Sequence, residues 1–378
     1  MPWSLLSMSA LREEFVRLAG AEDASVRSLC RRYGVSAKTG YKWLARFKRE
    51  GVKGLEDRSR RPVSSPRRSD SATEDAVLAL RERHPAWGGR KIAAALERQA
   101  GAAPSPSTVT AILRRHGVTI GAFGGGAAPF ARFEHAAPND LWQMDFKGHV
   151  AMRQGRLHPL TVLDDHSRFS VVLAACSDQT TDTVKAQLIK AFRRYGLPTR
   201  IMTDNGSPWG DGSGSSFTPL GVFLIEQGVR IGHSKPYHPQ TLGKDERFHR
   251  SLKAEALSGP PFGTIEEAAQ KLERWRHVYN SERPHEALGM KTPIERYQPS
   301  ALPFHETVEP FDYLQGDIVR RVQQGGWISF KGRVVRVPKA FGGKQIALRP
   351  NPQNGAFDIH FRHQKIKTLD FRTEPDHP

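Results

Sequence analysis

The sequence is poor in cysteine and contains no long apolar run. Only Cys30 and Cys176 occur among 378 residues, which excludes a disulfide framework and a thiolate zinc site and fits a reducing compartment. No apolar stretch reaches the roughly 20 residues of a membrane-spanning helix. The first residues, from Met1 to Leu5, lack the basic segment and apolar stretch of a secretory signal. We therefore expect a cytoplasmic protein with no membrane partner.

Acidic charge is scarce relative to basic charge. The chain carries 57 Lys and Arg against 39 Asp and Glu, a net charge of +18, and its pI is about 10.1. Half of this excess lies in residues 1–68, which hold 16 basic and 7 acidic side chains. Such a balance disfavours an ordinary metabolic enzyme and indicates a polyanionic partner, of which double-stranded DNA is the obvious case.

Three carboxylates lie at informative positions. Asp145 ends the largely apolar run 141–145, and Asp204 ends a second run at 200–204. Glu246 lies at the start of an amphipathic helical pattern. Two acids at strand ends and one on a helix can converge, and convergent oxygen ligands are what Mg²⁺ prefers. Two such ions can flank a phosphodiester, so this pattern points to phosphoryl-transfer chemistry.

The motifs around these acids resemble a known family. They are Trp142–Phe146, Leu163–Phe169, Thr203–Gly206 and Pro236–Arg247. Over about residues 138–300 the sequence resembles bacterial insertion-sequence transposases of the retroviral-integrase (DDE) superfamily. The resemblance implies that Asp145, Asp204 and Glu246 are the catalytic triad and the ligands of two Mg²⁺ ions, for which Mn²⁺ can substitute.

The same resemblance implies an activity. A transposase would bind the terminal repeats of an insertion sequence, cleave the DNA ends and transfer the strands into target DNA, as at least a dimer on DNA. An accessory ATPase is not implied. Two rival interpretations stay open: a structure-directed nuclease with the same fold and metals, and a non-catalytic DNA-binding regulator derived from such an enzyme.

The sequence departs from the family pattern between its second and third acids. The interval from Asp204 to Glu246 holds 41 residues, more than is usual, and the excess lies in the Gly/Ser-rich stretch 208–216. Retroviral integrases also carry an N-terminal His/Cys zinc module, which this sequence lacks. The conformation of the active-site loop is therefore open.

The N-terminal region has a helix-turn-helix pattern. Helices are expected near 9–20, 25–33 and 37–49, with a turn at Gly34 and Ser36 as the N-cap of the third. The third helix would enter the major groove of DNA; the alternative is a three-helix bundle without a DNA role. Across the chain, the expected DNA contacts are Lys38, Thr39, Lys42, Arg46, Arg58, Arg60, Arg61, Lys244, Arg247 and Lys253.

We expect a multidomain α+β protein. Its predicted parts are a helix-turn-helix domain (1–53), a basic linker (54–70), a second helical DNA-binding domain with Ser107 as a cap (71–120), a further linker (121–137), a ribonuclease-H-like α/β catalytic core (138–300) and a small C-terminal β-barrel (301–378). The core should contain strands at 141–146, 159–164, 168–175 and 199–203. Asp164 and Asp165 are expected to form a turn, and Asp245 and Glu255 to lie on a solvated helix face.

Overall fold

The computed structural model describes residues 7–59, 68–118, 134–210, 217–233, 243–352 and 355–372. The chain divides into two compact units, Met1–Arg68 and Ser69–Pro378. Among the described residues, no helix combines the length and the apolar character needed to cross a membrane.

The first unit is a bundle of three helices, as the sequence predicts. These are α1 (Met8–Ala19), α2 (Val26–Arg32) and α3 (Ala37–Glu50), followed by a 3₁₀ turn at Gly51–Leu55. Each α-helix begins after a serine whose hydroxyl accepts a hydrogen bond from a backbone N–H in the first turn, which satisfies a donor that the helix leaves unpaired. The buried core consists of Phe15, Val16, Cys30, Trp43 and Leu55.

The second unit begins with a further group of three helices, α4 (Ser71–Arg83), α5 (Gly89–Ala100) and α6 (Pro106–Arg115). The N-cap of α6 is Ser105, two residues before the predicted Ser107, because Pro106 occupies the first helical position, where its missing N–H costs nothing. Val278 packs against the core of this group, and Arg98 donates to the carbonyl of Met290 at 3.1 Å. The helical group therefore contacts the part of the chain that follows it.

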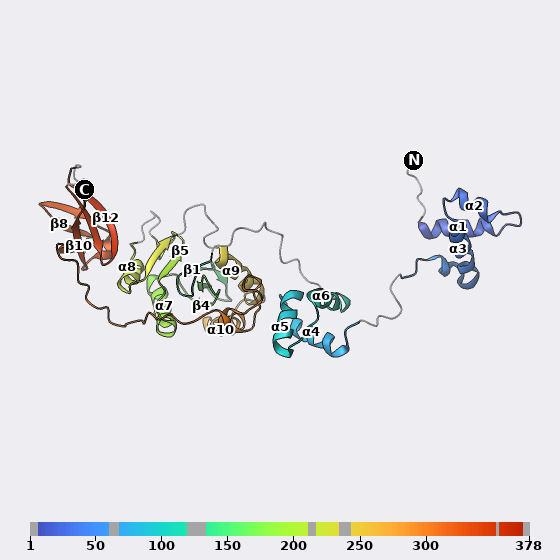
Figure 1. The fold of residues 1–378 in the computed structure, drawn as a ribbon, viewed down its shortest axis with the longest axis horizontal. Helices are drawn as coiled ribbons and strands as arrows, with labels where there is room; N and C mark the ends of the chain where they lie inside the picture. The colour runs from blue at the N-terminus through green and yellow to red at the C-terminus, as the bar shows by residue number, and fades with distance from the viewer. Residues whose placement is uncertain are drawn as a thin grey trace. The chain divides into compact units, whose positions relative to one another are not determined.

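A mixed sheet forms the centre of the second unit (Figure 1). The strand order is β2-β3-β1-β5-β6, with β4 paired to β3. β1 is antiparallel to β3 and parallel to β5, and β5 is parallel to β6. The strands are β1 (Trp142–Phe146), β2 (Val150–Ala151), β3 (Arg156–Asp164), β4 (Ser170–Cys176), β5 (Arg200–Thr203) and β6 (Arg230–His233). The four predicted strands are confirmed.

Helices cover both faces of this sheet (Figure 1). Side chains of successive strand residues, such as Val162 and Leu163, point to opposite faces; Val162 packs with α7 and α8, and Leu163 with α9 and α10. The helices are α7 (Thr181–Tyr195), α8 (Pro219–Glu226), α9 (Gly243–Glu255) and α10 (Ile265–Ser281), followed by short 3₁₀ turns at Glu286–Leu288 and Pro293–Glu295. This arrangement is the integrase-type, ribonuclease-H-like core that the resemblance implies.

The C-terminal region consists of short strands, but the predicted barrel is not confirmed. β12, β11, β10 and β7 form one antiparallel sheet, and β8 pairs with β9 in another, with no closure among the described strands. The elements are β7 (Ile318–Arg321), β8 (Trp327–Phe330), β9 (Arg333–Arg336), a 3₁₀ turn (Lys339–Phe341), β10 (Gln345–Pro350), β11 (Ala356–Phe361) and β12 (Gln364–Asp370). Val222 and Ile225 of α8 share the apolar core of these strands.

A buried ion pair anchors the C-terminal end of α9. Arg283 donates to Glu255 at 2.9 Å and 3.1 Å, and the indole N–H of Trp275 donates to the same carboxylate. The side chains of the pair are 9% and 10% exposed. Removing one partner of such a pair leaves a buried charge uncompensated, which costs more than the loss of a surface pair.

We predict that Glu255→Gln lowers the free energy of unfolding of the second unit by about 3 kcal/mol. The control is Glu306→Gln, which breaks a two-bond Arg–Glu pair with Arg193 whose side chains are 60% and 57% exposed; its effect should be much smaller, because water screens an exposed pair. Urea unfolding followed by tryptophan fluorescence measures both. Equal effects would show that α9 does not depend on this anchor.

Candidate active site

The two predicted strand-end acids are neighbours in the sheet. In the parallel pair of β1 and β5, Trp142 lies opposite Ile201, and Asp145 and Asp204 each follow three residues later. The pKa of Asp145 is raised to about 6, first by burial and then by the negative charge of Asp204. The structure therefore brings these two carboxylates together at the carboxyl-terminal ends of β1 and β5.

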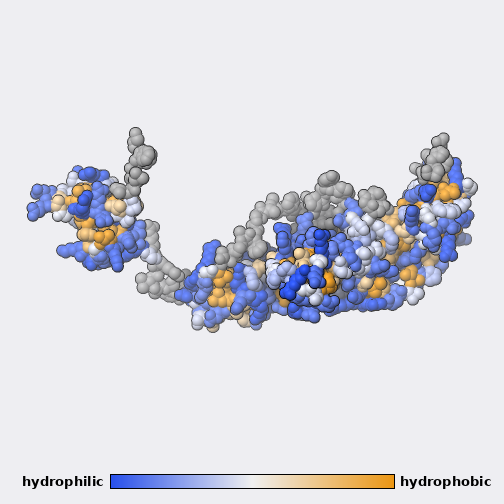
Figure 2. All heavy atoms as spheres, turned by 180° about the vertical axis from the view of Figure 1, so that it is seen from behind, coloured by the Kyte–Doolittle hydropathy of each residue, from blue (hydrophilic) through white to orange (hydrophobic). Residues whose placement is uncertain are grey.

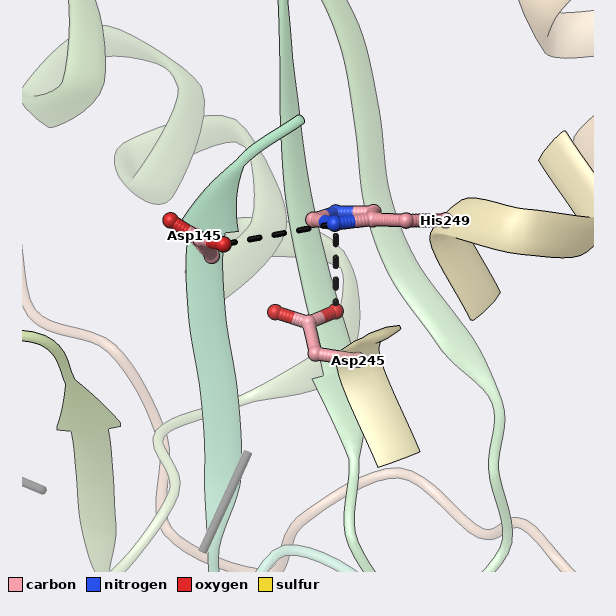
Figure 3. Close-up of side chains that lie close together, drawn as sticks. All are labelled: Asp145, Asp245 and His249. Carbon is pink, nitrogen blue, oxygen red and sulfur yellow. Dashed lines mark ion pairs between the residues drawn. The ribbon is translucent and has the colours of Figure 1, made fainter. Parts of the chain in front are cut away.

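Helix α9 covers this edge with two buried polar side chains (Figure 3). Asp245 and His249 are one helical turn apart, and His249 lies between Asp145 and Asp245. His249 Nδ1 is 4.0 Å from Asp145 Oδ2, and His249 Nε2 is 3.9 Å from Asp245 Oδ1. Ligand atoms of all three residues lie within 4.8 Å of one another, so the group could hold a divalent metal ion.

Thr161, on the neighbouring strand β3, contacts both Asp145 and His249. It is fully buried on β3, directly opposite Asp145 of β1. Its hydroxyl donates to the backbone carbonyl of Asp145 at 2.9 Å and lies 2.9 Å from His249 Nε2. The hydroxyl also lies 3.4 Å from Asp245 Oδ1, so Thr161 contacts all three residues of the group.

Burial shifts the pKa of each side chain of the pair on α9 toward its uncharged form. The pKa of Asp245 lies well above its usual value, first because the side chain is enclosed and then because of the charge of Asp145. Burial, assisted by Lys147, lowers the pKa of His249 to about 4. Asp245 Oδ2 has no hydrogen-bond partner among the described residues.

Glu246, the third predicted acid, is exposed on α9 beside Asp245. It is outside the close group of Asp145, Asp245 and His249, although its charge contributes to the raised pKa of Asp245. The prediction that Asp245 and Glu255 lie on a solvated face is wrong, because Asp245 is 1% exposed and Glu255 pairs with Arg283. The helical spacing of Asp245 and His249 from the apolar Leu252 already indicates that both lie on the buried face of the helix.

The carboxylate of Asp204 is held by the residues that follow it. Its Oδ1 accepts hydrogen bonds from the backbone N–H of Gly206 at 2.9 Å and from the indole N–H of Trp209. Neither Trp209 nor Thr161 was singled out from the sequence, because an isolated tryptophan in a Gly-rich stretch and a threonine in a strand carry no local signal. The predicted turn at Asp164 and Asp165 is confirmed, since Asp164 accepts from the backbone N–H and the hydroxyl of Ser167.

The predicted DNA contacts on and near α9 fall into two groups. Arg247 and Lys253 are exposed. Lys244 is instead largely buried and pairs with Asp165 at 2.5 Å. Asp165 also accepts from the side chain of Gln143 at 2.8 Å. Lys244 thus anchors the first turn of α9, where Asp245 and Glu246 lie.

The predicted contacts in the first unit also differ in exposure. Lys38 and Lys42 are exposed on α3, whereas Thr39 joins the N-cap of that helix through a 2.9 Å contact between its hydroxyl and that of Ser36. Arg46 is 8% exposed and its guanidinium lies over the ring of Trp43.

Arg58 forms an exposed ion pair with Glu50, and Arg60 and Arg61 lie outside the described residues. Hydrophilic side chains cover much of the surface drawn in Figure 2. A polar, basic surface of this kind is suited to a polyanionic partner.

Family comparisons match most of the chain in order. Residues 11–62 match a helix-turn-helix domain and residues 39–113 a homeodomain-like domain. Residues 135–239 and 227–293 each match an integrase core domain. Residues 317–377 match the C-terminal domain of IS481 family transposases.

Several relatives are proteins of insertion elements. An uncharacterized 31.7 kDa protein of IS407 from Burkholderia multivorans is 28% identical over 159 residues, which are 42% of this chain and 55% of the relative. A putative transposase of IS5376 from Geobacillus stearothermophilus is 26% identical over 246 residues, 62% of this chain and 59% of the relative. The chain thus spans about half of the length of the curated relatives that it matches.

The solved structures to which the chain shows some similarity include retroviral integrases. An intasome of simian T-cell lymphotropic virus has a TM-score of 0.40 at 14% identity, covering 78% of this chain and 96% of that chain. The catalytic core domain of HTLV-2 integrase in complex with magnesium has a TM-score of 0.32 at 15% identity, covering 43% and 97%.

The family matches run from a helix-turn-helix domain through an integrase core to a transposase C-terminal domain along one sequence, and insertion-element proteins are among its relatives. The chain therefore combines helix-turn-helix and homeodomain-like regions with an integrase core domain and a region that matches the C-terminal domain of IS481 family transposases.

Proposed function

We propose that this protein is a DDE transposase that binds the terminal repeats of an insertion sequence, cleaves the DNA ends and transfers the strands into target DNA. The observation that carries the proposal is the pairing of Asp145 and Asp204 at the ends of parallel strands beneath α9. Partly buried carboxylates that converge at the ends of two strands fit phosphodiester chemistry, which needs no side-chain nucleophile.

Asp145, Asp204 and Glu246 would hold two Mg²⁺ ions, with Mn²⁺ as a substitute. The donor set fits, because the charge of Asp204 helps to keep a proton on Asp145, and a divalent cation relieves this repulsion. When bound, such ions neutralise charge at the phosphodiester and lower the pKa of the attacking group. Asp145 must lose its proton to act as a ligand.

We assign the third ligand to Glu246 and a supporting role to Asp245. Glu246 is exposed to solvent, where DNA and hydrated ions have access, whereas Asp245 is enclosed and burial raises its pKa. Its contacts with His249 and Thr161 suit a residue that shapes the site from within the protein.

Both chemical steps exchange one phosphorus–oxygen bond for another. Water attacks the phosphorus at the element's end, and the 3′ oxygen leaves as a hydroxyl. That 3′ hydroxyl then attacks a target phosphodiester and displaces the target's own 3′ oxygen. The first step is a hydrolysis and the second conserves the number of phosphodiester bonds, so the chemistry itself consumes no nucleotide cofactor, and an accessory ATPase is not implied.

DNA would be bound by several parts of the chain. We keep the domain division 1–53, 71–120, 138–300 and 301–378 as a proposal, with the first two regions on the terminal repeats. Lys38, Lys42, Arg247 and Lys253 have the exposure that phosphate or base contacts require. Joining two element ends requires two active sites, so we propose at least a dimer on DNA, acting in the bacterial cytoplasm.

We predict that Glu246→Gln lowers strand transfer by on the order of 10³-fold, because loss of a metal ligand removes several kcal/mol of charge stabilisation. Asp245→Asn, the neighbouring control, should retain most of the activity, since asparagine keeps the shape of a side chain that we place outside the ligand set. The assay uses labelled duplex with the element's terminal sequence, a plasmid target and Mg²⁺.

The outcomes of that assay separate the rival functions. Cleavage without joining in the wild type would favour a nuclease. Binding without cleavage, unchanged by Glu246→Gln, would leave a DNA-binding regulator. Loss of activity in Asp245→Asn but not in Glu246→Gln would reverse our assignment of the third ligand.

We also predict a stability effect at Asp145. Its folded-state pKa of about 6 is above the usual 3.8, so the native state holds this proton more tightly. The associated stabilisation is complete below about pH 3.8 and is lost as the pH rises through 6. Without metal, Asp145→Asn should therefore raise the free energy of unfolding at pH 7.5 by up to about 3 kcal/mol, but not at pH 4.

The matched control is Asp312→Asn, which removes a charge from an exposed carboxylate and should change stability by less than about 0.5 kcal/mol at either pH. Added Mg²⁺ should stabilise the wild type and the control but not Asp145→Asn. Equal pH profiles for all three proteins would contradict the raised pKa of Asp145.

A further inference from the structure

The chain after Asp204 turns back so that Trp209 lies beneath the site. Trp209 is 2% exposed, and its ring stacks on Phe146 with a centroid distance of 5.4 Å and an interplanar angle of 21°. Phe146 directly follows Asp145 on β1. One side chain therefore contacts both strand ends that carry the proposed metal ligands.

The indole N–H of Trp209 is directed at one oxygen of Asp204. It donates to Oδ1, which also accepts from the backbone N–H of Gly206 at 2.9 Å. The indole nitrogen is a donor only, so it cannot rotate into another role at this position. No donor among the described residues contacts Asp204 Oδ2, and that oxygen remains open to a ligand.

Several contacts fix Trp209 in this position. The N–H of Gly210 donates to the carbonyl of Gly206 at 2.7 Å, which closes the turn. A β-carbon at position 210 would overlap the carbonyl of Asn205, so only glycine allows this approach. The hydroxyl of Thr218, the N-cap of α8, donates to the carbonyl of Trp209 at 3.4 Å. Backbone and ring are thus both held.

We propose that Trp209 is a positioning residue for the metal centre: its N–H fixes the carboxylate of Asp204 so that Oδ2 alone is offered to a divalent ion. This inference rests on the proposed function. Hydrogen bonds that orient a metal-binding carboxylate typically contribute about 10- to 100-fold to metal affinity. The turn at 204–210 would therefore be part of the catalytic apparatus, although none of its residues after Asp204 touches the metal.

The test removes the N–H and keeps the ring. In Trp209→Phe the aromatic contact with Phe146 is retained. The control is Trp142→Phe, in which a fully buried indole N–H to Asn139 Oδ1 is lost from the same sheet. In each variant the acceptor oxygen loses one of two hydrogen bonds. Asn139 Oδ1 keeps the bond from the hydroxyl of Tyr297, and Asp204 Oδ1 keeps the bond from the N–H of Gly206.

Two readouts on the full chain separate positioning from packing. The first is the Mg²⁺ concentration that gives half of the metal-dependent rise in the unfolding midpoint, measured without DNA. The second is the half-saturating Mg²⁺ concentration in strand transfer, compared with the maximal rate. We expect both concentrations to increase by about 10- to 100-fold in Trp209→Phe and to change by less than about twofold in Trp142→Phe.

Equal Mg²⁺ dependence in the two variants would overturn the inference and reduce Trp209 to a packing residue. If Trp209→Phe does not fold, a benzothienylalanine at position 209 replaces only the N–H by sulfur, and the same increase is expected. Asp204→Asn separates a failure of the proposed metal centre from a failure of the role proposed for Trp209. If it leaves the Mg²⁺ dependence unchanged, the proposed metal centre itself is wrong, whatever Trp209 does.

Discussion

The parallel pairing of β1 with β5 is the constraint on which the candidate site depends. Trp142 and Ile201 lie opposite each other and are completely buried on the face covered by α7 and α8. Side chains alternate between faces, so their burial fixes Asp145 and Asp204 on the other face at equal distance along the strands. A register shift by one residue would place apolar side chains in the site and one carboxylate in the core.

The layer between the sheet and α9 contains several buried polar side chains, and ion pairs compensate the charges at both ends of the helix. Lys244 pairs with Asp165 at the start of α9, and Glu255 pairs with Arg283 at its end. Asp245 and His249 lie between these anchors, and burial shifts the pKa of each toward its uncharged form. The charge of Asp204 adds to the effect of burial in raising the pKa of Asp145, so a divalent cation at this point would relieve a repulsion.

Local patterns predicted much of this structure. The strand at 141–146, the helix at 37–49 and the serine caps follow from periodicity and capping, and Asp145 and Asp204 were recognised at strand ends. Asp245 was misassigned because a charged residue is usually solvated, although its spacing from Leu252 indicates the buried face. The contact of Trp209 with Asp204 depends on a turn that has no sequence periodicity, so the sequence could not predict it. Whether the C-terminal strands close into a barrel depends on non-local strand pairing, which the sequence does not show either. The role of Glu246 stays a prediction.

The central claim is that Asp145 and Asp204 share a divalent cation at the end of β1 and β5. The most direct test is a crystal structure of the full chain soaked with Mn²⁺, in which anomalous scattering locates the ion. We predict a peak between Asp145 and Asp204 Oδ2, with Glu246 turned toward it. A peak enclosed by Asp145, Asp245 and His249, away from Asp204, or no peak at Asp145 at saturating Mn²⁺, would contradict the account.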